Sequence, residues 1–239
     1  MLNKILKKQD KEAVETLLCD ELHFSASEAY KLLRTNLLFA LPDEGKCRVI
    51  GLTSSIRGEG KSTTSINLSH AIAATGKRVL LIDGDLRLPT VAKKLGISSE
   101  YGLSDAIAGI ANVKDLMLTV KGIENWHIIT AGSIPPNPTE MLGSQRMNNI
   151  IDELSNSYDF IMIDRPPVNV VSDALVVSTL LDGMIIVVRS GYSKRREVAK
   201  CVKHIEMSRV KVLGIVLSSV HQSGKYYYHY GEQVYSKRG

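Results

Sequence analysis

A glycine-rich run, SIRGEGKSTT, has the residue types and spacing of a phosphate-binding loop. It meets the pattern G-x-x-x-x-G-K-[ST] at every fixed position except the first, where Ser55 replaces glycine. In such a loop the backbone N–H groups turn toward phosphate oxygens, the lysine spans the β and γ phosphates, and the hydroxyl that follows ligates Mg²⁺. The pattern therefore predicts binding of ATP with Mg²⁺. The predicted contact residues are Gly58, Glu59, Gly60, Lys61, Ser62 and Thr63.

Three aspartates at the ends of two apolar runs could serve the same ligand. Asp83 and Asp85 are two positions apart in VLLIDGDLRLP, so on an extended chain both point to one side. Asp164 ends the run YDFIMID at the position of a Walker B aspartate, which holds a magnesium-bound water. We predict that Lys61, Asp83, Asp85 and Asp164 are catalytic, with Ser62 and the three aspartates at the metal. Asp83 is favoured as the base that accepts a proton, and Asp85 as the metal-side carboxylate.

The elements that must position these groups alternate between β-rich and helical segments. The runs CRVIGLTS, KRVLLIDGD, NWHIITAGS, YDFIMIDRPP, DGMIIVVRS and VKVLGIVLSSV are apolar on both faces, as is typical of a parallel sheet covered by helices. Between them, STTSINLSHAIAATG, SQRMNNIIDELSNS, SDALVVSTLL and SKRREVAKCVKHIEMSR have apolar residues at intervals of three and four, which predicts helical crossovers. The phosphate loop then joins a strand to a helix. The expected fold is an α/β P-loop NTPase with a mostly parallel central sheet flanked by helices.

Length and composition favour one large domain, since the chain has 239 residues, of which 44% are hydrophobic. We expect a lead-in over residues 1–24, the P-loop domain over 25–220 and a flexible tyrosine-rich tail over 221–239. A helix over 25–41, with Ser25 or Ser27 as its N-cap and Pro42 after its end, would precede the first strand.

The cysteine spacing and the hydropathy argue against several other classes of protein, and the net charge limits the kind of surface. Three cysteines lack C-x-x-C spacing, so neither a zinc site nor a disulfide framework is indicated. The longest apolar stretch is interrupted by Asp182, so no transmembrane helix is expected. The net charge of +5 indicates a solvated basic surface, with an anionic membrane or nucleic acid as alternative contacts.

Together these motifs resemble the bacterial tyrosine kinases of capsule and exopolysaccharide synthesis. The resemblance covers nearly the whole chain and rests on SIRGEGKSTTSINLSHAIA, VLLIDGDLR, IPPNPTEMLGS, IMIDRPPV followed by SDA, and a terminal tyrosine cluster. It implies that the tail is the substrate, whose phenols attack the γ phosphate of ATP in the active site of another subunit. The implied phospho-acceptors are Tyr226, Tyr227, Tyr228, Tyr230 and Tyr235.

The resemblance also implies partners. Glu28, Lys31 and Arg34 are similar in spacing to the family's E-x-x-R-x-x-R element, through which subunits meet in a ring, and a solvated helix face is the alternative. The cytoplasmic tail of a transmembrane polysaccharide co-polymerase, acting as an adaptor, would recruit the cytoplasmic kinase to the inner face of the membrane. A cognate tyrosine phosphatase would reverse the reaction, and no nucleic-acid partner is expected.

Three arginines near the motifs have roles that the sequence leaves open. Arg57 stands where proline is common in the family and Arg165 where threonine is usual, and both are expected to add positive charge near the phosphates. Arg165 could stabilise the transferring phosphoryl group or pair with Asp164. Arg87, in the run DGDLR, is the third.

Other functions fit parts of the same pattern. A partition or positioning ATPase shares the fold, but its signature lysine would occupy the position of Ile56, and it would lack the tyrosine cluster. A nucleotide-binding scaffold would result if Arg165 silenced Asp164. An electron-transfer ATPase needs paired thiolates, and no cysteine lies in a suitable loop. We therefore predict a tyrosine autokinase that regulates polysaccharide polymerisation and export.

Overall fold

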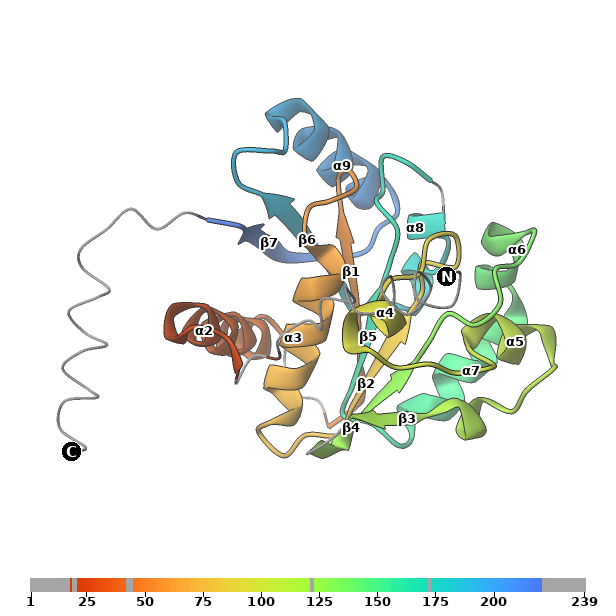
Figure 1. Cartoon of the computed structure of the whole chain (residues 1–239). Coiled ribbons are helices and arrows are strands. Elements are labelled where there is room, and N and C mark those ends of the chain that lie inside the picture. Colours follow the sequence, from red (N-terminus) through yellow and green to blue (C-terminus); the bar gives the residue numbers. More distant parts are fainter. Residues whose placement is uncertain (1–17, 19–20, 42–44, 121–122, 172, 221–239) are drawn as a thin grey trace, which may run out of the picture.

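The computed structural model describes residue 18 and residues 21–41, 45–120, 123–171 and 173–220. Seven strands form one sheet in the order β3-β4-β2-β5-β1-β6-β7 (Figure 1). The pair β3 and β4 is antiparallel, and all other neighbouring pairs are parallel. The strands are β1 (Arg48–Ser54), β2 (Val79–Asp83), β3 (Leu118–Val120), β4 (Ile123–Ile129), β5 (Phe160–Asp164), β6 (Gly183–Arg189) and β7 (Val212–Ser218). All six predicted strands are confirmed, and so is the mostly parallel sheet.

Helices cover both faces of this sheet (Figure 1). They are α2 (Phe24–Ala40), α3 (Lys61–Ala73), α4 (Val91–Leu95), α5 (Leu103–Ala108), α6 (Pro138–Leu142), α7 (Gln145–Ser155), α8 (Asp173–Val176) and α9 (Arg195–Met207), with 3₁₀ turns η2 (Val113–Leu116) and η3 (Ser178–Leu180). Within the described ranges, no helix has the length and hydropathy needed to cross a bilayer.

The alternation of side chains along β2 shows how the two layers form. Val79 and Leu81 pack in one core with α2 and α3, whereas Leu80 and Ile82 pack in a second core with α5 and α7. Successive side chains of a strand point to opposite faces, so a strand that is apolar throughout is buried on both sides. Burial of each such aliphatic side chain stabilises the fold by about 1.5–3 kcal/mol.

Four sequence-based expectations need correction. The three-residue edge strand β3 was missed because so short a segment carries no periodic pattern. The crossover predicted as one helix from SDALVVSTLL consists of the four-residue α8 and the turn η3. The outermost strand β7 is not covered on both faces, since Ile215 and Leu217 are 52% and 62% exposed. The helix α2 begins at Phe24 after His23, one to three residues earlier than the predicted serine caps, and without a side-chain cap.

The register of the sheet places the predicted catalytic carboxylates together. Asp83 and Asp164 are direct partners at the carboxyl ends of β2 and β5, and β1 lies on the other side of β5. Parallel strands present their carboxyl ends at a common edge, which is where such sheets bind ligands. The lead-in up to residue 17 and the tail over 221–239, with its five tyrosines, lie outside the described residues.

Candidate active site

The loop between β1 and α3 has the shape that a phosphate needs. Gly58 and Gly60 have φ values of +81° and +88°, a conformation that residues with a Cβ rarely adopt, and Gly60 is the N-cap of α3. The helix then begins at Lys61, so its free N–H groups face the loop. A cavity of about 350 Å³ opens there, and it is lined by Ser54, Arg57, Gly58, Glu59, Gly60, Lys61, Ser62, Thr63, Asp85, Leu88, Thr90, Lys94 and Pro167.

The loop lysine is the centre of a buried charge cluster. Lys61 Nζ lies 2.9 Å from Asp164 Oδ2 and 3.8 Å from Asp85 Oδ2, and its side chain is only 9% exposed. The other oxygen of Asp164 accepts a hydrogen bond of 2.9 Å from Ser65 of α3. The lysine neutralises carboxylates that would otherwise repel one another, and its ammonium group lies where a phosphate oxygen could replace them as its partner.

Asp83 and Asp85, predicted as base and as metal-side carboxylate, have different surroundings. Asp83 is fully buried, and its two oxygens accept three main-chain N–H groups, those of Asp85 at 3.2 Å and of Thr90 and Val91 at 3.0 Å each. Burial, helped by the negative charge of Asp164, raises the pKa of Asp83 to about 7. Burial also raises the pKa of Asp85, but this residue lines the cavity and Asp83 does not.

The glycine between these aspartates allows the loop to approach β5. The Gly84 N–H donates to the Asp164 carbonyl at 2.8 Å, and a Cβ on Gly84 would stand 2.9 Å from the Ile163 side chain. A side chain at this position would push the loop away from β5. The D-G-D spacing therefore serves packing as well as chemistry.

The donor set fits a magnesium ion that is shared with a nucleotide. Ser62 lines the cavity, and its Oγ accepts a hydrogen bond of 2.8 Å from Thr90. In the part of the chain that the structure describes, no group of three or more His, Cys, Asp or Glu side chains could hold a metal. Mg²⁺ usually takes one or two protein ligands together with phosphates and waters, so one hydroxyl and one carboxylate are sufficient.

The three arginines have separate positions. Arg57 lines the phosphate cavity, as expected. Arg87 pairs with Asp173 at 2.6 Å and also donates to Thr139. Arg165 donates to the Asp173 carbonyl at 2.5 Å, is only 1% exposed and is not among the cavity residues.

Arg165 therefore corrects one expectation. It does not add charge at the phosphates, and Asp164 is paired with Lys61 rather than with Arg165. Burial lowers the pKa of Arg165 to about 9, and its Nη1 has no hydrogen-bond partner among the described residues. The scaffold alternative, in which Arg165 silences Asp164, loses its structural basis.

Sequence reasoning missed five residues of the cavity wall: Ser54, Leu88, Thr90, Lys94 and Pro167. Thr90 is the N-cap of α4 and Lys94 lies in its last turn, and this helix of five residues is too short to give a periodic signal. The available signal was the hydroxyl of Thr90, seven positions after Asp83 and directly after a proline.

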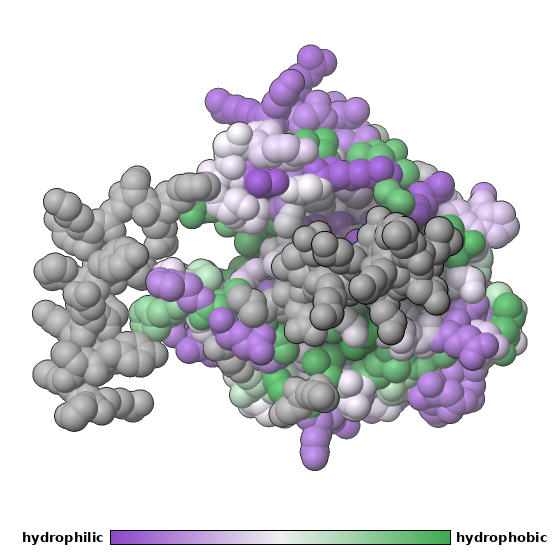
Figure 2. Space-filling view, viewed as in Figure 1, coloured by the Kyte–Doolittle hydropathy of each residue, from purple (hydrophilic) through white to green (hydrophobic). Residues whose placement is uncertain are grey.

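The predicted oligomerisation residues make contacts within one chain. Lys31 pairs with Glu28 at 2.8 Å along α2, and Arg34 donates to the Ala71 carbonyl of α3 at 3.0 Å. Two apolar side chains of α2, Leu32 and Phe39, are 60% and 85% exposed. On the face shown in Figure 2, hydrophobic and hydrophilic residues are interspersed.

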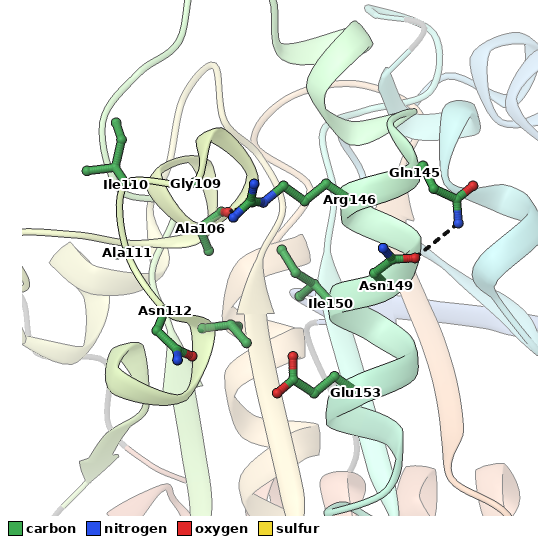
Figure 3. A pocket seen from close by; sticks show the side chains of 11 residues that line it. Ala106, Gly109, Ile110, Ala111, Asn112, Gln145, Arg146, Asn149, Ile150 and Glu153 are labelled. Carbon is green, nitrogen blue, oxygen red and sulfur yellow. Dashed lines mark hydrogen bonds between the residues drawn. The ribbon is translucent and has the colours of Figure 1, made fainter.

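A second, larger cavity of about 760 Å³ lies between α5 and α7 (Figure 3). Arg146 and Glu153 of α7 line it, and Gln145 donates to Asn149 along the same helix at 3.1 Å. None of the predicted catalytic residues lines this cavity. We therefore assign the chemistry to the smaller cavity, where the glycine loop, the lysine and the carboxylates meet.

A strand, a glycine loop, a helix that starts with lysine and an aspartate on the neighbouring strand define a P-loop NTPase. Over residues 47–213 the chain matches the family model described as an AAA domain. It is 34% identical over 215 residues to the putative tyrosine-protein kinase CapB of Staphylococcus aureus, covering 89% of this chain and 93% of that protein.

Solved structures agree with this relationship. The kinase domain of Escherichia coli tyrosine kinase ETK superimposes with a TM-score of 0.79 at 32% identity, over 84% of this chain and 78% of that one. The chimerical protein CapA2B2 gives a TM-score of 0.76 at 37% identity, over 80% and 84% of the two chains. The chain belongs to the bacterial tyrosine-protein kinases, which confirms the resemblance read from its motifs.

Proposed function

We propose that this protein is an ATP-dependent tyrosine autokinase that phosphorylates the tyrosine cluster of its own tail in a neighbouring subunit. The observation that carries the proposal is Lys61 in the wall of the phosphate cavity, paired with Asp85 of the same wall and with the buried Asp164, in a chain whose last residues are rich in tyrosine. The acceptors are Tyr226, Tyr227, Tyr228, Tyr230 and Tyr235.

Different residues of the site bind the phosphates of ATP and the metal ion. The loop N–H groups and Lys61 hold the β and γ phosphates, while Arg57 adds positive charge at the cavity wall. Ser62, with Asp164 through a water, would hold Mg²⁺, which neutralises phosphate charge when it is bound. Lys61 then exchanges its carboxylate partners for phosphate oxygens.

Asp85 is the proton acceptor that the geometry favours, in place of Asp83. A phenol has a pKa near 10, so a nearby base assists its attack at neutral pH. The phenol oxygen forms a bond to the γ phosphorus, the bond to the bridging oxygen breaks, ADP leaves with the electron pair, and the proton passes to Asp85. Asp83 instead anchors the loop through its three main-chain contacts.

A comparison of Asp85→Asn with Asp83→Asn tests this division of roles. If Asp85 is the base, Asp85→Asn lowers kcat by roughly 10²–10⁴-fold while leaving nucleotide affinity near that of the wild type. Asp83→Asn should weaken nucleotide binding more than it lowers kcat, because it loosens the loop. The reverse pattern would restore Asp83 as the base.

Phosphorylation between subunits needs its own test, because the length of the tail does not decide it. Ser218 ends β7 at the phosphate loop, and Tyr226 follows after eight positions (226 − 218), which extended chain spans in at most about 28 Å. A Lys61→Met chain with an intact tail should therefore be mixed with an active chain whose five tail tyrosines are phenylalanine. Phosphate on the inactive chain establishes transfer between subunits, and an unmodified inactive chain contradicts it.

Partners follow from the same proposal. A ring formed through Glu28, Lys31 and Arg34 would bring each tail to a neighbour, and the exposed Leu32 and Phe39 support an interface on α2. The cytoplasmic tail of a transmembrane polysaccharide co-polymerase would hold the cytoplasmic protein at the inner membrane face. A cognate phosphatase would reset the tail, and the cycle would regulate capsular or exopolysaccharide polymerisation and export.

A further inference from the structure

Glu59, in the middle of the phosphate loop, turns its carboxylate away from the cavity. The residue is 1% exposed, and its carboxylate accepts hydrogen bonds from Ser55 Oγ at 3.0 Å and from the Ile56 N–H at 2.8 Å. It also accepts a hydrogen bond from Ser193 Oγ, in the turn that precedes α9. A carboxylate directed at the phosphates would repel them, so these donors keep it on the far side of the loop.

Two carbonyl groups of the same loop accept hydrogen bonds from side chains that lie outside the loop. Ser218 Oγ, at the end of β7, donates to the Glu59 carbonyl at 2.5 Å, and Arg189 Nη1, at the end of β6, donates to the Gly58 carbonyl at 3.3 Å. The Ser218 hydroxyl would stand only 3.1 Å from a Cβ on Gly60. This close approach gives a second reason for glycine at position 60, besides its φ.

We propose that Ser193 and Ser218 are positioning residues that hold the phosphate loop in its binding conformation through Glu59. A peptide unit is planar and trans, so its N–H and C=O groups point in opposite directions. When the carbonyls of Gly58 and Glu59 are held outward, the N–H groups of Glu59 and Gly60 are directed inward, where phosphate oxygens bind. The loop is thus organised before the nucleotide arrives.

The loop motif itself gives no sign of these residues. Ser193 and Ser218 are 134 and 159 positions from Glu59 in the chain. They reach it because β6 and β7 end at the same edge of the sheet as β1. Neither serine is part of the phosphate-loop pattern, and neither lines the phosphate cavity.

The test is the affinity for ADP with Mg²⁺, measured by titration calorimetry, together with kcat and KM for ATP. The inference rests on the proposed nucleotide site, so wild-type protein that fails to bind ADP would refute the proposed function rather than this inference. With binding established, Ser218→Ala is expected to weaken ADP affinity about 3–10-fold and raise KM accordingly, which corresponds to one hydrogen bond, while kcat changes less. Ser218→Thr, which keeps the hydroxyl, should restore affinity to within about twofold.

A matched control separates positioning from a general loss of stability. Ser99 also donates its hydroxyl to a main-chain carbonyl, that of Tyr101 at 2.6 Å, but on the surface and outside the phosphate loop. Ser99→Ala should leave ADP affinity unchanged. Ser193→Ala, in the turn before α9, should weaken ADP affinity as Ser218→Ala does. It tests the inference independently if Ser218→Ala fails to fold. Wild-type affinity in both alanine variants would overturn the inference.

Discussion

Replacement of Lys61 by methionine should destabilise the nucleotide-free protein as well as inactivate it. The ammonium lies 2.9 Å from Asp164 and 3.8 Å from Asp85. At an effective dielectric constant of about 20, these separations give roughly 6 and 4 kcal/mol of attraction before the desolvation of the ions is subtracted. Removal of one partner from a buried pair typically costs about 3–5 kcal/mol, and we expect a loss in that range at pH 8.

The pH dependence of this loss identifies its cause. Burial raises the pKa of Asp85 and brings that of the neighbouring Asp83 to about 7, so fewer of the carboxylates that Lys61 attracts are ionised at pH 5 than at pH 8. The cost of removing the lysine should therefore be smaller at pH 5. Urea unfolding followed by circular dichroism at both pH values measures it, with the exposed Lys93→Met as control, expected within about 0.5 kcal/mol of the wild type.

A further substitution tests the electrostatic explanation directly. Adding Asp164→Asn to Lys61→Met removes the uncompensated carboxylate, so the double variant should recover part of the lost stability. A loss below about 1 kcal/mol at pH 8, or an equal loss at pH 5, would refute the reasoning. The result also matters in practice, because an inactive control at this position must first be shown to be folded.

Three further predictions concern residues around the site. Arg165→Met should leave autophosphorylation near the wild-type rate, because the side chain is outside the cavity; a severe loss in phosphate incorporation would contradict this. The pKa of Asp83 in the folded protein exceeds its ordinary value of 3.8, so the contribution of Asp83 to stability is complete below about pH 4 and is lost as pH rises through about 7. The melting temperature of Asp83→Asn should therefore depend less on pH across this window than that of the wild type. An unchanged pH dependence would contradict this prediction. Arg34→Ala should cost about 1 kcal/mol in urea unfolding of the monomer, because the hydrogen bond to the Ala71 carbonyl is lost, and an unchanged midpoint would show that the bond contributes nothing.

The sequence predicted those parts of the fold whose signals are long or tightly spaced. Six strands were recognisable because they lie in runs rich in apolar residues, and the phosphate loop because its glycines and lysine stand at fixed intervals. The antiparallel strand β3 and the helices α4 and α6 were not, since three to five residues carry no period.

The site was predicted less completely because its contacts come from distant segments. Sequence spacing placed Asp83 and Asp85 on one side but could not show that one is enclosed by main-chain amides while the other reaches the cavity. It placed Arg165 next to Asp164, yet successive residues of an extended chain point to opposite sides, and Arg165, directly after the end of β5, contacts Asp173 instead. Thr90 and Lys94 line the cavity because the fold brings the α4 segment next to the phosphate loop, which sequence spacing does not show.

Intact-mass analysis after incubation with ATP and Mg²⁺ shows whether this kinase modifies its own tail. The account predicts stepwise addition of phosphate that maps to Tyr226, Tyr227, Tyr228, Tyr230 and Tyr235. The variant with all five changed to phenylalanine keeps the catalytic residues and should gain no phosphate. Hydrolysis of ATP by the wild-type chain with an unmodified tail would contradict the account and favour a positioning ATPase.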